Sequence, residues 1–307
     1  MNISTSKKKV SILTSLYRSE DFLSRYFENL SKLDGTDILE VLLLHNAPNE
    51  KELKIIDEYL PVLNFVRHIV IEDRESLYST WNRGIKLSYG EYITIWNVDD
   101  VRFPESILQQ VESLDKNPQA MISYGDIWIS SEYGICGNKR TYSPDNNRKK
   151  DFFKAYHMSC FQMWRTSIHE EIGYYDEQFH CSADFDFQIR AAIHFPFIKT
   201  KEVLGIYLED QPHKLSSSTL QNKENNIIHL RYGAYQHLNL LNLQLSLEKY
   251  HKKKILFFSE WYLFVEKSQF GLIYKTGGLI VAFFNSIILS LKKIAKIILC
   301  RKKIQHS

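Results

Sequence analysis

The chain has 307 residues, of which 44% are hydrophobic, so it is long enough for one sizeable domain and an appendage. Its formal net charge is +3, but residues 251–307 contain eleven Lys or Arg and two acids, which leaves −6 on residues 1–250. A nucleic-acid-binding domain would carry the basic residues on its folded part, so this distribution excludes nucleic acid as a partner.

Apolar runs with strand character alternate with helical patterns from the beginning of the chain. The runs occupy 10–17, 38–46, 65–71 and 91–95, and a helical pattern at 76–88 precedes the last of them. Such alternation is typical of βαβ units. The sequence therefore predicts an α/β fold with a doubly wound, mostly parallel sheet.

Two adjacent carboxylates, Asp99 and Asp100, follow the strand predicted at 91–95. Ligands of open α/β sheets bind beyond the carboxyl ends of the strands, so this pair indicates a binding site. Paired carboxylates suit a hard cation such as Mg²⁺ or Mn²⁺, which in turn suits a diphosphate. A β-turn or a helix N-cap before Pro104 is the alternative interpretation, since Asp favours both.

The second half of the chain is predicted to complete the domain and to add a helical extension. Residues 120–165 look like strands around a polar, turn-rich loop at 142–150. Apolar spacing predicts a long helix at 222–250. We therefore expect a catalytic domain at 1–220 and a C-terminal helical region at 221–307.

The N-terminal segment and the cysteines both favour a cytoplasmic protein. Lys7, Lys8 and Lys9 lead directly into a predicted strand, so no signal peptide is expected. The cysteines show neither metal-like spacing nor an evident disulfide framework, as is typical of reduced thiols. They are Cys136, Cys160, Cys181 and Cys300.

The C-terminal tail combines apolar and basic residues. Its apolar segment at 279–291 is shorter than the roughly 20 residues needed to span a bilayer, and Asn285 interrupts it. Because Lys292, Lys293 and Lys296 follow, the pattern predicts a basic amphipathic helix in peripheral contact with an anionic membrane. A helical subdomain docked on the catalytic domain is the alternative.

Four motifs together resemble the family 2 glycosyltransferases, which are inverting enzymes with the GT-A fold. They are Ser11–Tyr17, Asn82–Gly84, Asn97–Asp100 and Ala183–Asp186, in the family's order along the chain. The resemblance implies a GT-A, Rossmann-like sheet with a C-terminal helical extension. It also implies transfer of a sugar from a nucleotide diphosphate sugar.

The chain departs from the family's pattern at three places. Asn97 and the pair His45-Asn46 stand where the family usually has an Asp, and Ala183 stands where it often has a Glu. The first two departures keep a hydrogen-bonding group but remove negative charge. Donor choice and metal affinity are therefore the properties that they affect.

The resemblance implies that seven residues bind the nucleotide sugar. The Tyr17 ring can stack on a base, and Arg74 offers a planar cation to the diphosphate. Asn82 would hold the nucleotide end of the donor. A surface ion pair of Arg74 with Asp73 or Glu75 is the alternative. The seven residues are Ser15, Tyr17, Asn46, Arg74, Asn82, Asn97 and Asp99.

The resemblance also implies a cofactor and a catalytic base. Mn²⁺ or Mg²⁺ would lie between the diphosphate and Asp99, with Asp100 as a second ligand or as the residue that orients Asp99. His213, on a later loop, is the third candidate ligand. Asp184 would take the proton from the acceptor hydroxyl, although a helix N-cap is the alternative role for it.

These features predict a metal-dependent, inverting glycosyltransferase of the hexosyltransferase type, with a UDP-sugar as the favoured donor. Its acceptor would be a glycan or a lipid-linked glycan in surface polysaccharide or glycolipid biosynthesis, at the cytoplasmic face of the membrane. The Gln-x-x-Arg-Trp motif of processive synthases is absent, which favours transfer of a single sugar.

Two other functions compete with this one. A catalytically inactive glycan- or nucleotide-binding scaffold with the same fold is favoured by His45, Asn97 and Ala183. A nucleotidyltransferase would need a Gly-rich, basic phosphate loop after the first strand, and residues 14–19 do not form one.

Overall fold

The computed structural model describes residues 8–141, 143, 149–209, 219–239 and 280–288. The chain divides into two compact units, Met1–Lys214 and Leu215–Ser307. The domain boundary predicted at residue 220 stays a prediction.

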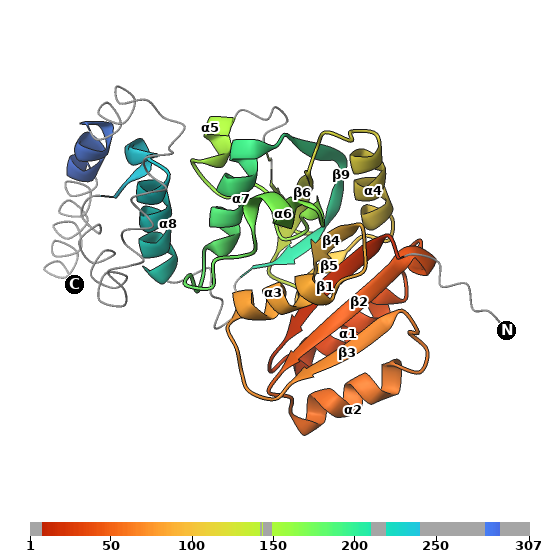
Figure 1. The fold of residues 1–307 in the computed structure, drawn as a ribbon. Helices are drawn as coiled ribbons and strands as arrows, with labels where there is room; N and C mark the ends of the chain where they lie inside the picture. Colours follow the sequence, from red (N-terminus) through yellow and green to blue (C-terminus); the bar gives the residue numbers. More distant parts are fainter. Residues whose placement is uncertain (1–7, 142, 144–148, 210–218, 240–279, 289–307) are drawn as a thin grey trace, which may run out of the picture. The chain divides into compact units, whose positions relative to one another are not determined.

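In the first unit, the described residues form a nine-stranded sheet with helices on both faces (Figure 1). The strand order is β3-β2-β1-β4-β8-β6-β9-β5, and β7 pairs with β6. The strands are β1 (Val10–Leu16), β2 (Leu39–Asn46), β3 (Val66–Ile71), β4 (Tyr92–Ile95), β5 (Val101–Arg102), β6 (Ile122–Ser130), β7 (Lys139–Arg140), β8 (Met163–Arg165) and β9 (Phe197–Leu208).

The half of the sheet that comes first in the chain is parallel. β1 pairs in parallel with β2 and β4, and β2 pairs in parallel with β3. β8 is antiparallel to β4 and β6, whereas β6 and β9 are parallel to each other. The predicted α/β fold with a mostly parallel sheet is confirmed.

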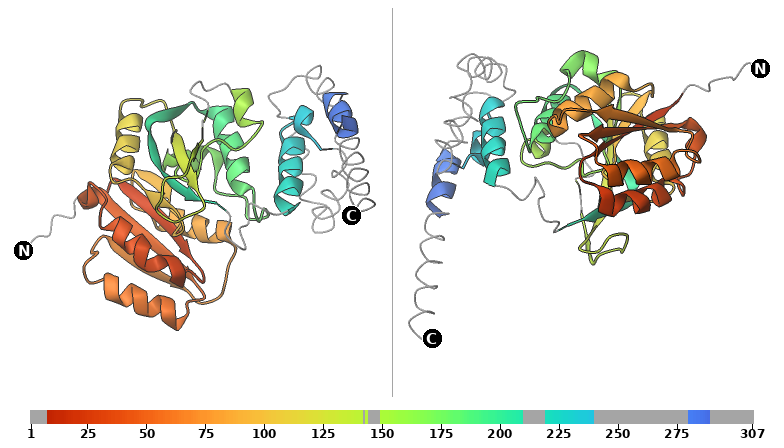
Figure 2. Two further views of the ribbon diagram at one scale, coloured as in Figure 1. Left: turned by 180° about the vertical axis from the view of Figure 1, so that it is seen from behind. Right: turned by 90° about the horizontal axis from the view of Figure 1, so that it is seen from below.

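The connecting helices lie on opposite faces of this parallel half (Figure 2), with α1 and α2 on one side and α3 on the other. They follow the strands in the βαβ order that the sequence predicts. The helices of this unit are α1 (Glu20–Leu30), the 3₁₀-helix η1 (Thr36–Ile38), α2 (Glu50–Tyr59), α3 (Leu77–Leu87), α4 (Ser106–Asp115), α5 (Lys149–Phe152), α6 (Ile168–Ile172) and α7 (Ala183–His194).

The core forms on both faces of β2, whose eight residues are all buried. Val41 packs with Phe27 of α1 and Ile56 of α2 on one face. On the other face, a Cβ added to Gly84 of α3 would stand 2.6 Å from the Leu44 side chain. Glycine therefore permits α3 to pack closely on the sheet, and the continuous apolar run of β2 fits a strand covered on both sides.

The second unit is described in three short helical pieces. The helix predicted at 222–250 is shorter than expected, because it ends at Arg231. Gly233 follows with a φ of 71°, the left-handed conformation that commonly ends helices. The described pieces are α8 (Thr219–Arg231), η3 (Tyr235–His237) and a helical segment at 280–288.

The segment 280–288 exposes large apolar side chains. Phe283 is 56% exposed and Phe284 is 59% exposed, and four aliphatic neighbours are also exposed. Within the described parts of the chain, no helix is long and apolar enough to cross a bilayer. The basic residues that follow, from residue 289, lie outside the described residues.

Candidate active site

The predicted acidic pair lies in a turn directly after β4. The Asp100 N–H bonds the Asn97 carbonyl at 3.1 Å, and the Trp96 indole N–H donates to the Asp100 carbonyl at 3.0 Å. The β-turn interpretation is therefore correct for the backbone. The turn buries the Asp100 side chain and leaves Asp99 half-buried, so Asp99 is accessible to a ligand.

The Asp100 carboxylate holds the end of a neighbouring strand. Its Oδ1 accepts the Leu208 N–H at 3.2 Å, at the last residue of β9. The chain runs from β9 into the segment that carries His213, which lies outside the described residues. Asp100 therefore holds the end of β9, which precedes the segment that contains His213, the third predicted metal ligand.

Of the three candidate metal ligands, Asp99 and Asp100 lie among the described residues and His213 does not. Among the residues that the structure describes, no group of three or more His, Cys, Asp or Glu side chains could hold one. Asp99 is the accessible carboxylate of the predicted set, since Asp100 already accepts a backbone N–H. Asp99 fits Mn²⁺ or Mg²⁺ when phosphate oxygens, water or a further side chain complete the shell.

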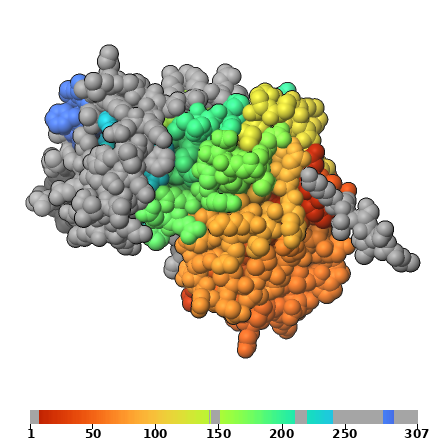
Figure 3. Space-filling view, in the orientation of Figure 1, coloured from red at the N-terminus to blue at the C-terminus, as the bar shows by residue number. Residues whose placement is uncertain are grey.

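Asp184 lies in the first turn of α7, half-buried. Ser182 occupies the N-cap position, so the N-cap interpretation of Asp184 is wrong. The Tyr78 hydroxyl of α3 donates to Asp184 Oδ1 at 3.3 Å. In Figure 3, the orange surface, the colour of the α3 residues, borders green surface from later in the same unit. Asp186, the next acid, is fully buried and pairs with Arg190 at 2.8 Å, a structural role.

The acidic turn and Asp184 each raise the pKa of one side chain in the segment 156–160. Burial raises the pKa of the Cys160 thiol, and the negative charges of Asp100 and Asp99 raise it further. Burial also raises the pKa of Tyr156, with the charge of Asp184 as the next cause and Cys160 among the others. The acids of the turn therefore act on Cys160, and Asp184 acts on Tyr156.

The backbone next to these two side chains is strained at Ser159 and is bonded by a buried cation, Arg102, at Phe161. Ser159 has a φ of 61°, unusual for a residue with a side chain, and its carbonyl accepts the Tyr156 hydroxyl at 3.0 Å. Arg102, 2% exposed, donates to the Phe161 carbonyl at 3.2 Å. Burial lowers the pKa of Arg102 to about 9. The sequence carried no signal for Arg102, because no motif marks its partners Thr94, Gln110 and Phe161.

The turn after β1 carries Tyr17, and an arginine covers its ring. The guanidinium carbon of Arg74 lies 3.8 Å from the centroid of the Tyr17 ring. Arg18, next in the turn, has a φ of 52°. Glu75 pairs with Arg83 at 2.8 Å, which replaces the surface pair of Arg74 with Glu75 considered from the sequence.

Two predicted donor-binding residues lie at one edge of the sheet. Ser15 is near the end of β1 and Asn97 follows β4, and both are half-buried. Because β1 and β4 are adjacent and parallel, their carboxyl ends meet at the same edge. Asp99 comes two residues after Asn97, so the acidic turn shares this edge.

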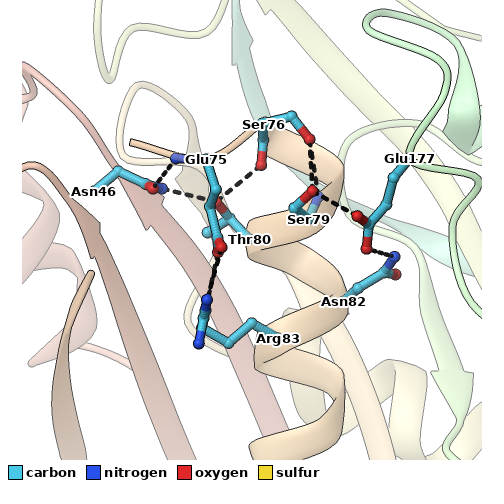
Figure 4. A network of polar contacts seen from close by, with 8 residues as sticks. All are labelled: Asn46, Glu75, Ser76, Ser79, Thr80, Asn82, Arg83 and Glu177. Carbon is cyan, nitrogen blue, oxygen red and sulfur yellow. Dashed lines mark hydrogen bonds and ion pairs between the residues drawn. The ribbon is translucent and has the colours of Figure 1, made fainter. Parts of the chain in front are cut away.

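The other two asparagines of the predicted set are buried and hydrogen-bonded within the protein (Figure 4). Asn46 Oδ1 accepts the Glu75 N–H at 3.2 Å, and its Nδ2 donates to Thr80 at 2.7 Å. Asn82 Nδ2 donates to the Tyr175 carbonyl and its Oδ1 accepts the Tyr175 N–H, both at 2.9 Å. Both amides hold backbone segments in place, and their contact with a nucleotide stays a prediction.

His45 takes part in a buried network that the sequence did not reveal. Its Nε2 lies 3.1 Å from Glu52 Oε2, and its Nδ1 lies 3.0 Å from His68 Nε2. Glu52 Oε1 accepts the Ser19 N–H at 2.6 Å, so the network holds the turn after β1 to α2. The capping box of Asn49 and Glu52 was the available sequence signal.

Comparison with protein families and curated proteins places the chain among glycosyltransferases. The model of the family described as "Glycosyl transferase family 2" matches residues 11–173. "Uncharacterized glycosyltransferase MJ1057" of Methanocaldococcus jannaschii is 26% identical over 191 residues, which cover 60% of this chain and 64% of that protein. "Glycosyltransferase GlyG" of Streptococcus pneumoniae is 28% identical over 109 residues, which cover 34% of this chain and 36% of that protein. The match spans less than two thirds of either relative.

Solved structures share the fold at low sequence identity. TarS 1-349 of S. aureus in complex with UDP-GlcNAc has a TM-score of 0.62 and 15% identity, and covers 76% of this chain and 68% of its own. The mannosyltransferase PcManGT of Pyrobaculum calidifontis, in complex with GDP-Man and Mn²⁺, has a TM-score of 0.56 and 11% identity, with coverages of 92% and 88%. The predicted GT-A fold is confirmed. Because the family model matches more than half of the chain, the chain belongs to glycosyl transferase family 2.

Proposed function

We propose that this protein is an inverting, metal-dependent glycosyltransferase of the hexosyltransferase type that transfers one sugar from a nucleoside diphosphate sugar. The observation that carries the proposal is that the Asp99–Asp100 turn follows β4 at the carboxyl edge of the parallel strands, while Asp184, in the first turn of α7, accepts a hydrogen bond from Tyr78 of α3. Carboxylates at strand ends suit the diphosphate and its metal, and a separate carboxylate suits proton transfer from the acceptor.

The donor side of the site consists of Ser15, Tyr17, Arg74, Asn97 and Asp99. Arg74 lies on the Tyr17 ring, so its charge is held near the strand ends, where it can meet the diphosphate. A UDP-sugar is the favoured donor, because the TarS complex with UDP-GlcNAc has the higher TM-score of the two structures described above. Asn46 and Asn82 would support this side through the segments that they hold.

Mn²⁺ or Mg²⁺ would be held by Asp99 together with the donor's phosphates, with His213 as a further candidate ligand. The Mn²⁺ bound to PcManGT supports a metal at this fold's site. A bound divalent ion would stabilise the charge that develops on the leaving nucleoside diphosphate. Asp100, buried and bonded to β9, would orient Asp99 and the His213 segment.

The acceptor side of the site consists of Asp184 and the segment 173–184 that precedes it. Asp184 would accept the proton of the attacking hydroxyl, which approaches from the face opposite the leaving group. Hydrogen bonds from the Tyr78 hydroxyl and the Phe185 N–H to Oδ1 orient the carboxylate. Inversion needs only this one base, because no covalent intermediate forms.

The acceptor would be a glycan or lipid-linked glycan of surface polysaccharide or glycolipid biosynthesis, reached at the cytoplasmic face of the membrane. Exposed apolar residues at 280–288 and the basic composition of 251–307 support peripheral contact with anionic lipid. The full-length double variant Phe283→Ser and Phe284→Ser should co-sediment less with anionic liposomes, and the wild type should be released by salt. Equal sedimentation of both proteins would favour a docked subdomain.

The first test is calorimetric titration of UDP, GDP, dTDP and CDP into the full-length protein, with Mn²⁺ and again with EDTA. Metal-dependent binding of one nucleotide, with UDP expected, would establish the donor class. Transfer would then be measured as release of that nucleotide from its sugar conjugates. A folded protein that binds none of the four would contradict the proposal and favour the inactive scaffold.

A further inference from the structure

Helix α3 holds the acceptor-side segment by hydrogen bonds from three of its side chains. The Tyr78 hydroxyl reaches Asp184, and Ser79 and Asn82 both reach Glu177 (Figure 4). These donors lie within the first two turns of α3. Tyr78 and Ser79 stand four and three residues before Asn82, so each is its neighbour on the helix surface. One helix face therefore contacts both the loop at 173–179 and the predicted base.

Glu177 makes the central contact of this set. Its Oε2 accepts the Ser79 hydroxyl at 2.8 Å, and its Oε1 accepts the Asn82 Nδ2 at 2.8 Å. The hydrogen bond from Asn82 is the main reason that the pKa of the Glu177 carboxyl is lowered. The Glu177 side chain is otherwise exposed. Because both of its carboxylate oxygens bind side chains of α3, we call these two hydrogen bonds the Glu177 clamp.

The same helix is attached to the donor side at its first turn. Asn46, the last residue of β2, bonds the Glu75 N–H and the Thr80 hydroxyl. Ser76 caps α3 through its bond to the Ser79 N–H at 3.2 Å. A continuous series of hydrogen bonds thus runs from the end of β2 through α3 to Glu177, as Figure 4 shows.

We propose that Glu177 is a positioning residue that sets where Asp184 lies relative to the donor. The inference rests on the proposed function, in which Asp184 is the base. Glu177 precedes Asp184 by seven residues, and Asn82 also binds the Tyr175 backbone in the same segment. Release of this clamp would let the base shift, and a misplacement of about 1 Å can reduce a rate by about 100-fold.

Two variants at this position separate geometry from charge. Glu177→Ala removes both hydrogen bonds. Glu177→Gln can keep both, because its amide oxygen can accept from Asn82 while its NH₂ group donates to the Ser79 oxygen. Glu171→Ala is the matched control, since Glu171 is an exposed glutamate on the neighbouring helix α6 and has no part in the proposed site.

The experiment measures kcat, the donor KM, nucleotide affinity and thermal unfolding for all three variants. Glu177→Ala should lower kcat by about 10- to 100-fold while the donor KM and the UDP affinity stay within about twofold of wild type. Glu177→Gln should restore kcat to within about threefold. A role in general stability alone would instead lower the melting temperature and nucleotide affinity together.

Wild-type kcat in Glu177→Ala, or equal loss in Glu177→Ala and Glu177→Gln, would overturn the proposal. Hydrogen–deuterium exchange of the segment 173–184 gives a readout that does not need turnover. Exchange there should rise in Glu177→Ala and not in Glu171→Ala, and unchanged exchange would also overturn it. If the wild type binds no nucleotide and transfers no sugar, the proposed function fails, and exchange still decides whether the clamp exists.

Discussion

On the proposed donor side, Ser15 lies near the end of β1 and Asn97 follows the adjacent parallel strand β4, whereas on the proposed acceptor side Asp184 lies on a helix that side-chain hydrogen bonds connect to α3. The first arrangement follows from backbone pairing along the whole strand. The second depends on contacts such as Tyr78 to Asp184, between residues 106 positions apart. The two sides therefore differ in how many interactions hold each functional group.

This difference indicates how each side should respond to substitution. A strand end is held by a ladder of backbone bonds, so a side chain there can be removed with little movement of its neighbours. The proposed base, Asp184, is held by a few side chains and can be displaced by one change. Donor-side variants should therefore change ligand affinity, and acceptor-side variants should change turnover.

The largest effect is expected for Asp184→Asn. The amide keeps an oxygen that can accept the Tyr78 hydroxyl and the Phe185 N–H but cannot act as a base, so kcat should fall at least 100- to 1,000-fold. UDP affinity by calorimetry should stay within about twofold of wild type. Asp37→Asn, at an exposed acid outside the site, is the control. A loss of UDP affinity in Asp184→Asn as large as its loss of kcat would contradict the distinction between the two sides.

A smaller effect is expected for Asp99→Ala, on binding instead of turnover alone. Loss of the accessible carboxylate should weaken Mn²⁺-dependent UDP binding by at least about tenfold, and the difference between Mn²⁺ and EDTA should disappear. Asp37→Ala serves as the control. Unchanged Mn²⁺-dependent affinity in Asp99→Ala would remove Asp99 from the set of metal ligands.

Tyr17→Leu should have a more modest effect, because it releases Arg74 from the ring at 3.8 Å. A cation–π contact of this kind is worth about 1 kcal/mol, so UDP affinity should fall by about fivefold while uridine affinity changes less. Tyr89→Leu removes a similar contact with Arg67, at 4.6 Å, outside the site. Equal effects of the two substitutions would deny Tyr17 a role in placing Arg74.

The smallest effect is expected for His169, which lies in α6, the helix directly before the loop at 173–179. Its Nε2 accepts the Trp164 indole N–H at 2.9 Å, and burial lowers its pKa to about 4. As the pH falls below about 6.5, His169 binds a proton in the unfolded chain but stays neutral in the folded chain. Its contribution to the free energy of unfolding is therefore fully present above pH 6.5 and is lost as the pH falls toward 4.

His169→Gln should keep the two hydrogen-bonding functions without titrating, because Gln offers one acceptor and one donor. Its melting temperature should fall less than that of wild type between pH 7 and pH 5, by a few degrees. Identical dependence of both melting temperatures on pH would show that His169 does not set the acid sensitivity of the acceptor side.

Much of the sheet could be predicted from the sequence. The runs at 38–46, 65–71 and 91–95 correspond to β2, β3 and β4 to within one residue at either end. Parallel strands buried on both faces require continuous apolar runs, and such runs are visible without any partner. The acids after β4 were found for the same reason, since the end of a strand marks the edge of the sheet.

Other residues could not be placed in this way. The pattern at 222–250 continued past Arg231, and only the left-handed conformation of Gly233 shows where the helix stops. Arg102 and Glu177 carry no motif of their own. Glu177 acquires its role from Ser79 and Asn82, which are distant along the chain, and Arg102 from a set that includes the distant Phe161. No local periodicity reports such partners.

The sequence by itself determined the α/β fold, the strand-end acids and the resemblance to family 2 glycosyltransferases, because apolar periodicity and motif order are local properties of the chain. Only the tertiary structure decided that Asn46 and Asn82 bond the protein's own backbone, that Ser182 and not Asp184 is the N-cap of α7, and that Glu177 binds α3. The reason is physical: a hydrogen bond depends on distances of about 3 Å between atoms, and packing of the whole domain sets those distances.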